Sequence, residues 1–113
     1  CQRAVAQAGG EELFERGREC LAAGDPCAAA AHFRHALAQR PDRRDWTLLL
    51  AEATDACKRD GNAQRVLENA LARWPDFNEA RLALARLHLR DGRAAAAATL
   101  LPALKGRRRT RPA

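Results

Sequence analysis

The stretch GDPCAAAAHFRHALAQRPD, residues 24–42, predicts a turn, one helix and the end of that helix. Gly24 tolerates a positive φ, Asp25 is a favourable N-cap, and Pro26 suits the first helical position. Apolar side chains follow at helical spacing and predict one buried face; they are Ala29, Phe33, Ala36 and Leu37. The end of the stretch returns 34 residues later, where Ala70-Leu71-Ala72 repeats Ala36-Leu37-Ala38 and Pro75-Asp76 repeats Pro41-Asp42.

The same step of 34 residues aligns other positions of the chain. Two columns hold only small residues, which are Gly17, Ala51 and Ala85 in one and Ala29, Ala63 and Ala97 in the other. Two further columns hold only large apolar residues, which are Phe14, Leu48 and Leu82 in one and Phe33, Leu67 and Leu101 in the other. A fixed period of this length indicates a stacked-repeat architecture. The small columns fit that interpretation, because a residue without bulk lets the two helices of a hairpin approach closely.

On these positions the chain resembles the tetratricopeptide repeat family, whose unit is a helix-turn-helix of about 34 residues. The first repeat, residues 10–43, carries the family's small, aromatic and proline positions in full, as Gly17, Ala29, Phe33, Ala36 and Pro41. The second repeat, residues 44–77, carries Ala51, Ala63, Leu67, Ala70 and Pro75 at the same places. The third, residues 78–111, has Leu104 and Arg109 at the last two places, so the pattern fades.

The sequence departs from the family pattern at two places. Arg16 stands where the family has a large apolar residue. Gly61 falls three places later in its repeat than Gly24 and Gly92 do in theirs. The shift predicts a longer first helix and a shorter second helix in the second repeat.

The resemblance implies an all-α fold, a tetratricopeptide solenoid (an α-α superhelix) of three helix-turn-helix repeats. The pattern places six helices near residues 11–23, 27–39, 44–59, 63–73, 78–91 and 93–104. The repeat domain then spans residues 10–104, between an N-terminal spacer at 1–9 and a basic tail at 105–113 that we expect to be disordered. Pro102 predicts a kink or an early end in the sixth helix. The last repeat has no polar capping helix, which predicts a dimer contact, a bound partner, or a bent sixth helix that folds over its own end.

Composition favours a helical scaffold over an enzyme. The 113-residue chain lacks tyrosine and methionine, and it carries no apolar run of the roughly 20 residues that span a bilayer. Glycine-rich phosphate loops, an HExxH pair and a GxSxG elbow are missing from the sequence. His32 and His35 can share a helix face near Cys27, but no further ligand follows at metal-site spacing. We therefore predict no catalytic residues, no cofactor and no metal.

In this family the first helix of each repeat lines a concave groove that binds a peptide or a partner protein. Transferred by position, the resemblance assigns nine groove residues: Phe14, Arg18, Leu21, Leu48, Glu52, Asp55, Leu82, Arg86 and Leu89. Their mixture of apolar and charged side chains suits an extended or helical peptide with apolar anchors. Chaperone-tail binding is not predicted, because the places of the family's carboxylate clamp hold Phe14, Arg18, Leu49, Glu79 and Ala83.

The four cysteines leave several arrangements open. Cys1 at the first position is typical of a lipidated bacterial lipoprotein, or it is where a fragment begins. Cys20 and Cys27 flank the first predicted turn, so a disulfide between them is credible in an oxidising compartment. Cys57 lies near the corresponding end of the third helix and competes for Cys20, and buried thiols are the remaining alternative. A lipid on Cys1 predicts a tethered protein of the bacterial periplasm; without it we expect a cytoplasmic protein.

Positive charge is concentrated at the C-terminus. Of the net charge of +6, five charges come from Lys105, Arg107, Arg108, Arg109 and Arg111. One alternative function is therefore anion binding through this basic tail, to nucleic acid or to an acidic membrane surface. Nucleic acid is disfavoured, because no aromatic residues are interleaved to stack on bases. The leading hypothesis is a non-enzymatic scaffold that binds another protein, in bacterial envelope, secretion or pilus assembly, and a cytosolic adaptor is the other alternative.

Overall fold

The computed structural model describes residues 8–105 of the chain, and the side chains of residues 8–100. This part of the chain is all-α: it forms six helices and contains no strand. The helices are α1 (Gly10–Ala22), α2 (Pro26–Gln39), α3 (Arg44–Cys57), α4 (Asn62–Arg73), α5 (Asn78–Arg90) and α6 (Ala94–Lys105). Each predicted helix is present, and each predicted end lies within two residues of the observed one.

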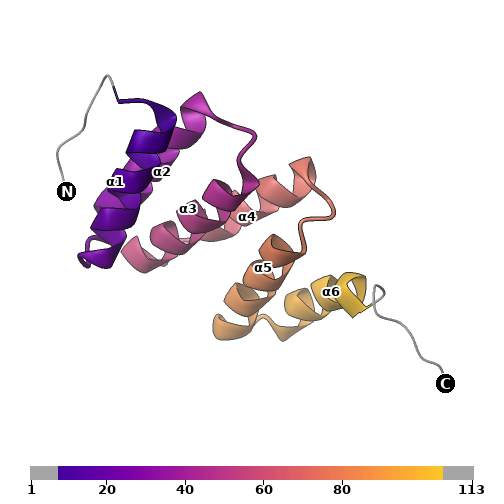
Figure 1. The fold of residues 1–113 in the computed structure, drawn as a ribbon. Coiled ribbons are helices and arrows are strands. Elements are labelled where there is room, and N and C mark those ends of the chain that lie inside the picture. Colours follow the sequence, from indigo (N-terminus) through magenta and orange to yellow (C-terminus); the bar gives the residue numbers. More distant parts are fainter. Residues whose placement is uncertain (1–7, 106–113) are drawn as a thin grey trace. The chain divides into compact units, whose positions relative to one another are not determined.

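The chain divides into two compact units, with the boundary between Val66 and Leu67 inside α4. In the N-terminal unit α1 packs against α2 and α2 packs against α3, as the indigo, purple and magenta ribbons of Figure 1 show. A cluster of buried residues from all three helices forms its core, and Val66 of α4 packs against that cluster. The buried members are Cys20, Ala29, Ala30, Phe33, Leu50 and Ala53.

Three aromatic rings connect the helices of the N-terminal unit. The ring of Phe14 on α1 lies 5.4 Å from that of Phe33 on α2 and stacks at 4.7 Å on Trp46 of α3. Phe33 also explains the small residue at position 17, because a Cβ on Gly17 would lie only 2.5 Å from the Phe33 Cε1 atom. The close approach of α1 and α2 therefore depends on a glycine at this position.

Arg16 precedes that glycine and is only partly accommodated. Its Nη2 donates a hydrogen bond to Glu12 across 3.3 Å, one helical turn away. Its Nε atom is buried and has no hydrogen-bond partner among the described residues. The departure from the family's apolar residue thus leaves an unsatisfied polar atom at the edge of the packed interior.

The turn between the helices of each repeat contains a glycine in the left-handed region, with φ of 87° at Gly24, 89° at Gly61 and 81° at Gly92. After the first turn, Asp25 caps α2 by accepting a hydrogen bond from the Ala28 amide at 3.3 Å. The later position of Gly61 has the predicted effect. Helix α3 has 14 residues against 13 in α1, and α4 has 12 against 14 in α2.

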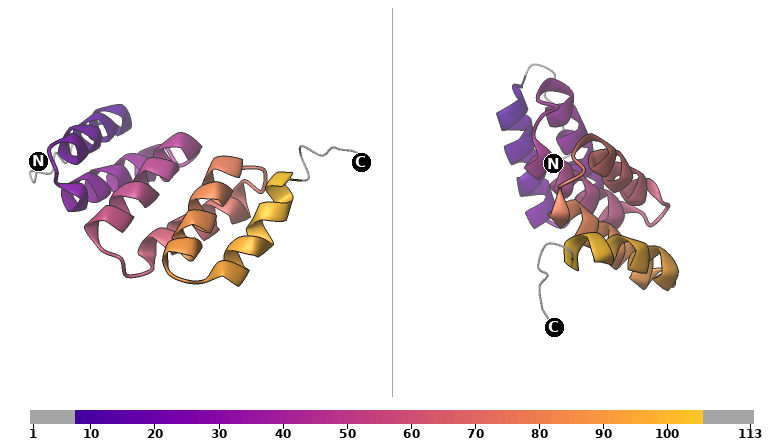
Figure 2. Two further views of the ribbon diagram at one scale, coloured as in Figure 1. Left: turned by 90° about the horizontal axis from the view of Figure 1, so that it is seen from below. Right: turned by 90° about the vertical axis from the view of Figure 1, so that its right-hand side faces the viewer.

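In the C-terminal unit α5 packs against α6, and Figure 2 shows this hairpin in orange and yellow from two further directions. The corner before α5 is held by Trp74, whose ring meets that of Phe77 edge-on at 6.0 Å. Arg81 closes the same corner by donating from Nη2 to the Pro75 carbonyl at 2.8 Å. Of the two effects predicted for Pro102, the early end of the sixth helix is wrong, because α6 continues through it to Lys105; the kink stays a prediction. Proline removes one backbone hydrogen bond, and the flanking alanines and leucines are strong helix formers that retain the helix.

Burial confirms the two small-residue columns of the 34-residue repeat. The alanine column Ala29, Ala63 and Ala97 is buried at every repeat, and so is the small column Gly17, Ala51 and Ala85. One more column is buried at every repeat, and it is made of Cys20, Thr54 and His88. Thr54 donates to the Leu50 carbonyl at 2.7 Å, and His88 accepts from Arg93 at 3.2 Å. The repeats therefore share an interior position that holds a thiol, a hydroxyl and an imidazole in turn.

No helix within the described part of the chain is both long enough and apolar enough to cross a bilayer.

Candidate functional site

In the N-terminal unit, six of the nine predicted groove residues lie on α1 and α3, and none of the six is buried. Phe14 and Leu21 of α1 and Leu48 of α3 are half-buried. Arg18 and Glu52 are exposed, and Asp55 is intermediate. The stack of Phe14 on Trp46 brings the two helices together, so apolar and charged side chains from both contribute to the surface of this unit.

Arg18 and Phe14 form a small composite surface on α1. The guanidinium carbon of Arg18 lies 6.0 Å from the centre of the Phe14 ring, and Arg18 also pairs with Glu15 at 3.6 Å. Both members of that ion pair are well exposed, so a partner's charge can compete for either of them at little cost. Phe14 also packs against the interior and so belongs to the core as well as to the surface.

In the C-terminal unit, all three predicted groove residues are exposed. Leu82 is 38% exposed and Leu89 is 54% exposed, and these are the large hydrophobic residues that stand open to solvent in the described part of the chain. They lie seven residues apart on α5 with the exposed Arg86 between them, so all three share one face of the helix. The buried face of α5 is formed instead by Ala80, Leu84, Ala85 and His88.

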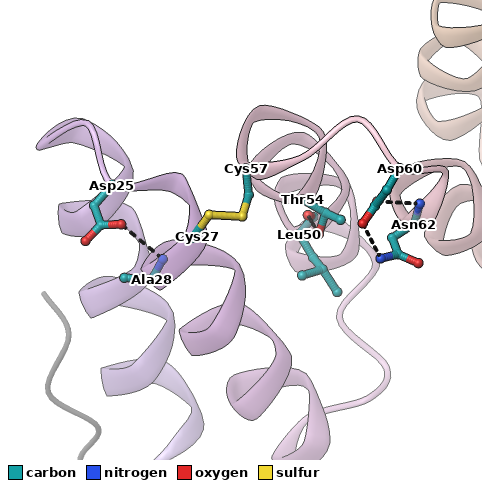
Figure 3. The surroundings of a disulfide bond; sticks show 8 residues. All are labelled: Asp25, Cys27, Ala28, Leu50, Thr54, Cys57, Asp60 and Asn62. Atoms are coloured by element: carbon teal, nitrogen blue, oxygen red, sulfur yellow. Dashed lines mark hydrogen bonds between the residues drawn. A yellow bond between two sulfur atoms is a disulfide. The ribbon is translucent and has the colours of Figure 1, made fainter.

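The predicted disulfide between Cys20 and Cys27 is wrong. The bond joins Cys27 to Cys57, with the two Cα atoms 4.7 Å apart, and Figure 3 shows it linking the start of α2 to the end of α3. Cys27 is exposed and Cys57 is half-buried, whereas Cys20 points into the core cluster of its unit. Because α2 and α3 pack antiparallel, the first turn of one meets the last turn of the other. Burial raises the pKa of the Cys20 thiol, which keeps it in the protonated, unreactive form.

Charged side chains meet where α1 begins, α2 ends and α3 begins. Glu11 pairs with Arg40 at 3.1 Å and with Arg43 at 3.9 Å, and Arg43 pairs with Asp45 at 3.2 Å. The Arg43 guanidinium also lies over the ring of Trp46, 4.3 Å from its centre. Trp46 carries no predicted role, although it is one of the largest fully buried side chains. The signal for this burial was the place of Trp46 in the first turn of the helix that follows Pro41, the proline of the first repeat.

The two histidines of α2 do not form a common site, because His32 is buried and His35 is exposed. Residues 8–100 hold no group of three or more metal-ligating side chains. Cys1 and the arginines of the basic tail, Arg107, Arg108, Arg109 and Arg111, lie outside the described residues. Lys105 is the last residue of α6, and its side chain lies outside the described part.

Comparison with known protein families finds two matches. Residues 14–55 and residues 61–113 each match a family model described as a tetratricopeptide repeat. Neither the curated proteins nor the solved structures contain a match to this chain.

Proposed function

The chain belongs to the tetratricopeptide repeat family, and from that premise we propose that the exposed side chains on the first helix of each repeat bind a peptide or a partner protein. One observation carries this proposal. Leu82 and Leu89 expose much of their surface on one face of α5, with Arg86 between them. Covering apolar surface of this kind is favourable by about 25 cal/mol per Å², and a cation between the two anchors adds a preference for an acidic residue.

The partner chemistry that fits this surface is a segment with two apolar side chains and a carboxylate between them. The spacing of Leu82 and Leu89 spans two helical turns, roughly 10 Å. An amphipathic helix or an extended peptide can place two anchors at that distance.

Selection from a random peptide library, with the full chain as the target, tests the proposal. We expect the selected peptides to combine apolar anchors with acidic residues. The variant Leu82→Ser/Leu89→Ser should lose binding at least about tenfold, since it removes most of the contact surface. The matched control Ala38→Ser/Ala72→Ser changes two exposed helical residues elsewhere and should bind as the wild type does.

Two outcomes would contradict the proposal. Binding that survives Leu82→Ser/Leu89→Ser would exclude the α5 surface as the docking site. Binding that is lost on deletion of residues 105–113, while those leucines are present, would favour the alternative in which the basic tail binds an anionic partner through its cations.

We also propose that the protein works in an oxidising compartment, such as the bacterial envelope. The disulfide between Cys27 and Cys57 supports this location, because reducing compartments keep most protein thiols free. Alkylation of the protein in intact producing cells, followed by mass measurement, tests it. We expect Cys27 and Cys57 to be unmodified before reduction, and the same mass shows whether Cys1 carries a lipid. Alkylation of both cysteines without prior reduction would instead favour a cytoplasmic adaptor.

A further inference from the structure

An open pocket of about 380 Å³ lies beside the disulfide in the N-terminal unit. The disulfide forms part of its wall, and the rest comes from α2, from the end of α3, from the turn before α4 and from the first residue of α4. The residues that matter for its chemistry are Arg34, Thr54, Lys58, Asp60 and Asn62. None of the nine predicted groove residues lines it, so this pocket is a separate surface from the proposed docking face.

The charges of the pocket are unbalanced in favour of cations. Arg34 and Lys58 are both exposed, and neither forms an ion pair with a carboxylate among the described residues. The one carboxylate in the wall belongs to Asp60, which accepts hydrogen bonds from the Asn62 amide at 3.2 Å and from Asn62 Nδ2 at 3.1 Å. Figure 3 shows the Asp60 side chain turned onto Asn62 in this way.

The disulfide fixes the distance between the two walls that carry the cations. Arg34 follows Cys27 by two helical turns on α2, and Lys58 follows Cys57 directly at the end of α3. With the Cα atoms of the two cysteines 4.7 Å apart, the guanidinium and the ammonium are tethered to a common covalent link. An anion that enters can therefore meet two cations without reordering the two helices.

We propose that this pocket is a second binding site, for a small ligand that carries a carboxylate or a phosphate. Arg34 offers a planar fork of N–H donors that matches either group, and Lys58 adds a point charge. The pocket volume lies in the range of sites that hold small organic ligands. The inference does not depend on the proposed peptide surface, and either proposal can fail alone.

Titration of the full, oxidised chain with inorganic phosphate and, separately, with succinate tests the proposal. Both are added at constant ionic strength against sodium chloride, and binding is followed by NMR on the backbone amides and the arginine side chains. We expect saturable shifts confined to the pocket for at least one probe. A response to phosphate alone assigns a phosphate ligand, and a response to succinate alone assigns a carboxylate.

The variant Arg34→Gln/Lys58→Gln should raise the dissociation constant at least about tenfold, because each lost charged hydrogen bond is a substantial part of a small ligand's affinity. Both positions are exposed, so the fold should be retained, and far-UV circular dichroism checks this. The control Arg40→Gln/Arg90→Gln removes the same net charge at two exposed positions outside both the pocket and the proposed docking face, and should bind as the wild type does. Shifts that never saturate, or an equal loss of binding in the control, would overturn the proposal.

Discussion

At the scale of single residues, Gly17 and its neighbour Arg16 on α1 have opposite effects on packing. Gly17 is required by contact, since the Phe33 ring occupies the space that a Cβ would need. Arg16 carries a buried Nε without a partner, and it gains only an exposed ion pair with Glu12 in return. Both effects agree with the family pattern, in which the seventh residue of the repeat is apolar and the eighth is small. Gly17 follows this pattern at the eighth place, and Arg16 departs from it at the seventh.

Gly17→Ala should destabilise the protein by about 1–3 kcal/mol, because the new methyl group overlaps the Phe33 ring and must displace it. Urea unfolding measures the loss. In a Phe33→Leu background, where Cε1 and Cζ of the ring are gone, the same change should cost at least about 1 kcal/mol less. Equal costs in the two backgrounds would show that ring contact is not the cause.

Arg16→Leu should stabilise the protein by about 1 kcal/mol. It removes the unpaired Nε, whose burial costs roughly 1–3 kcal/mol, and forfeits an exposed helical ion pair worth roughly 0.2–0.5 kcal/mol. Glu12→Gln in the same denaturation series measures the ion pair alone. A loss of stability in Arg16→Leu that exceeds the loss in Glu12→Gln would refute this account.

Cys20 should make stability depend on pH in the alkaline range. Burial raises its pKa in the folded state above that in the unfolded state, so the folded state holds the proton more tightly. The contribution of the buried thiol to the free energy of unfolding is therefore fully present below the ordinary thiol pKa of about 8.5. This contribution is lost as the pH rises from there through the higher pKa of Cys20 in the folded state. The stability advantage of the wild type over Cys20→Ala should shrink between about pH 7 and about pH 10, measured by rapid urea denaturation; a constant difference would contradict it.

At the scale of elements, the positions of the helices could be predicted from the sequence, and the pairing of the cysteines in the disulfide could not. The 34-residue period, the turn glycines and the caps are local signals, and they placed α1 to α6 to within two residues. The pairing of cysteines depends on which way each side chain points. Cys20 and Cys27 are closer in sequence, but Cys20 faces the core cluster while Cys27 faces the end of α3.

The exposure of Leu82 and Leu89 agrees with the groove positions of the family. Helical periodicity alone does not predict this exposure, because it places Leu84 and Leu89 on the buried face of the helix almost equally well.

The covalent link between α2 and α3 should contribute about 3–4 kcal/mol to stability, the value expected for closing a loop of this length, with the two cysteines 30 residues apart. Thermal unfolding with and without a reducing agent measures the contribution. Cys20→Ala retains the link and should remain sensitive to reduction, whereas Cys27→Ala/Cys57→Ala should be insensitive. A reductant effect that persists in the double variant would show that the link is not its source.

At the scale of the whole molecule, the three repeats are alike in their interiors and differ at their surfaces. Every described member of the alanine and small-residue columns is buried. The features on which the functional proposals depend do not repeat: the exposed leucines on α5, the pocket beside the disulfide, and the five cations of the basic tail. The fold could be predicted from the sequence because repetition amplifies its signal, and the groove positions of Leu82 and Leu89 followed from the same repeat. The pocket could not be predicted, because it depends on a cysteine pairing that occurs at one place in the described part of the chain.

The bond between Cys27 and Cys57 also determines how the chain responds to mechanical force. A pull applied at the two termini is carried across the sulfur–sulfur bond, so the residues between the cysteines bear no load. Their 30-residue separation removes about 100 Å of extension from the stretched chain. Optical-tweezer traces should show a contour length shorter by that amount than in Cys27→Ala/Cys57→Ala, and equal lengths would mean that the bond is absent in the stretched molecule. Half of the first repeat and half of the second would then remain held together while the rest of the chain is drawn out.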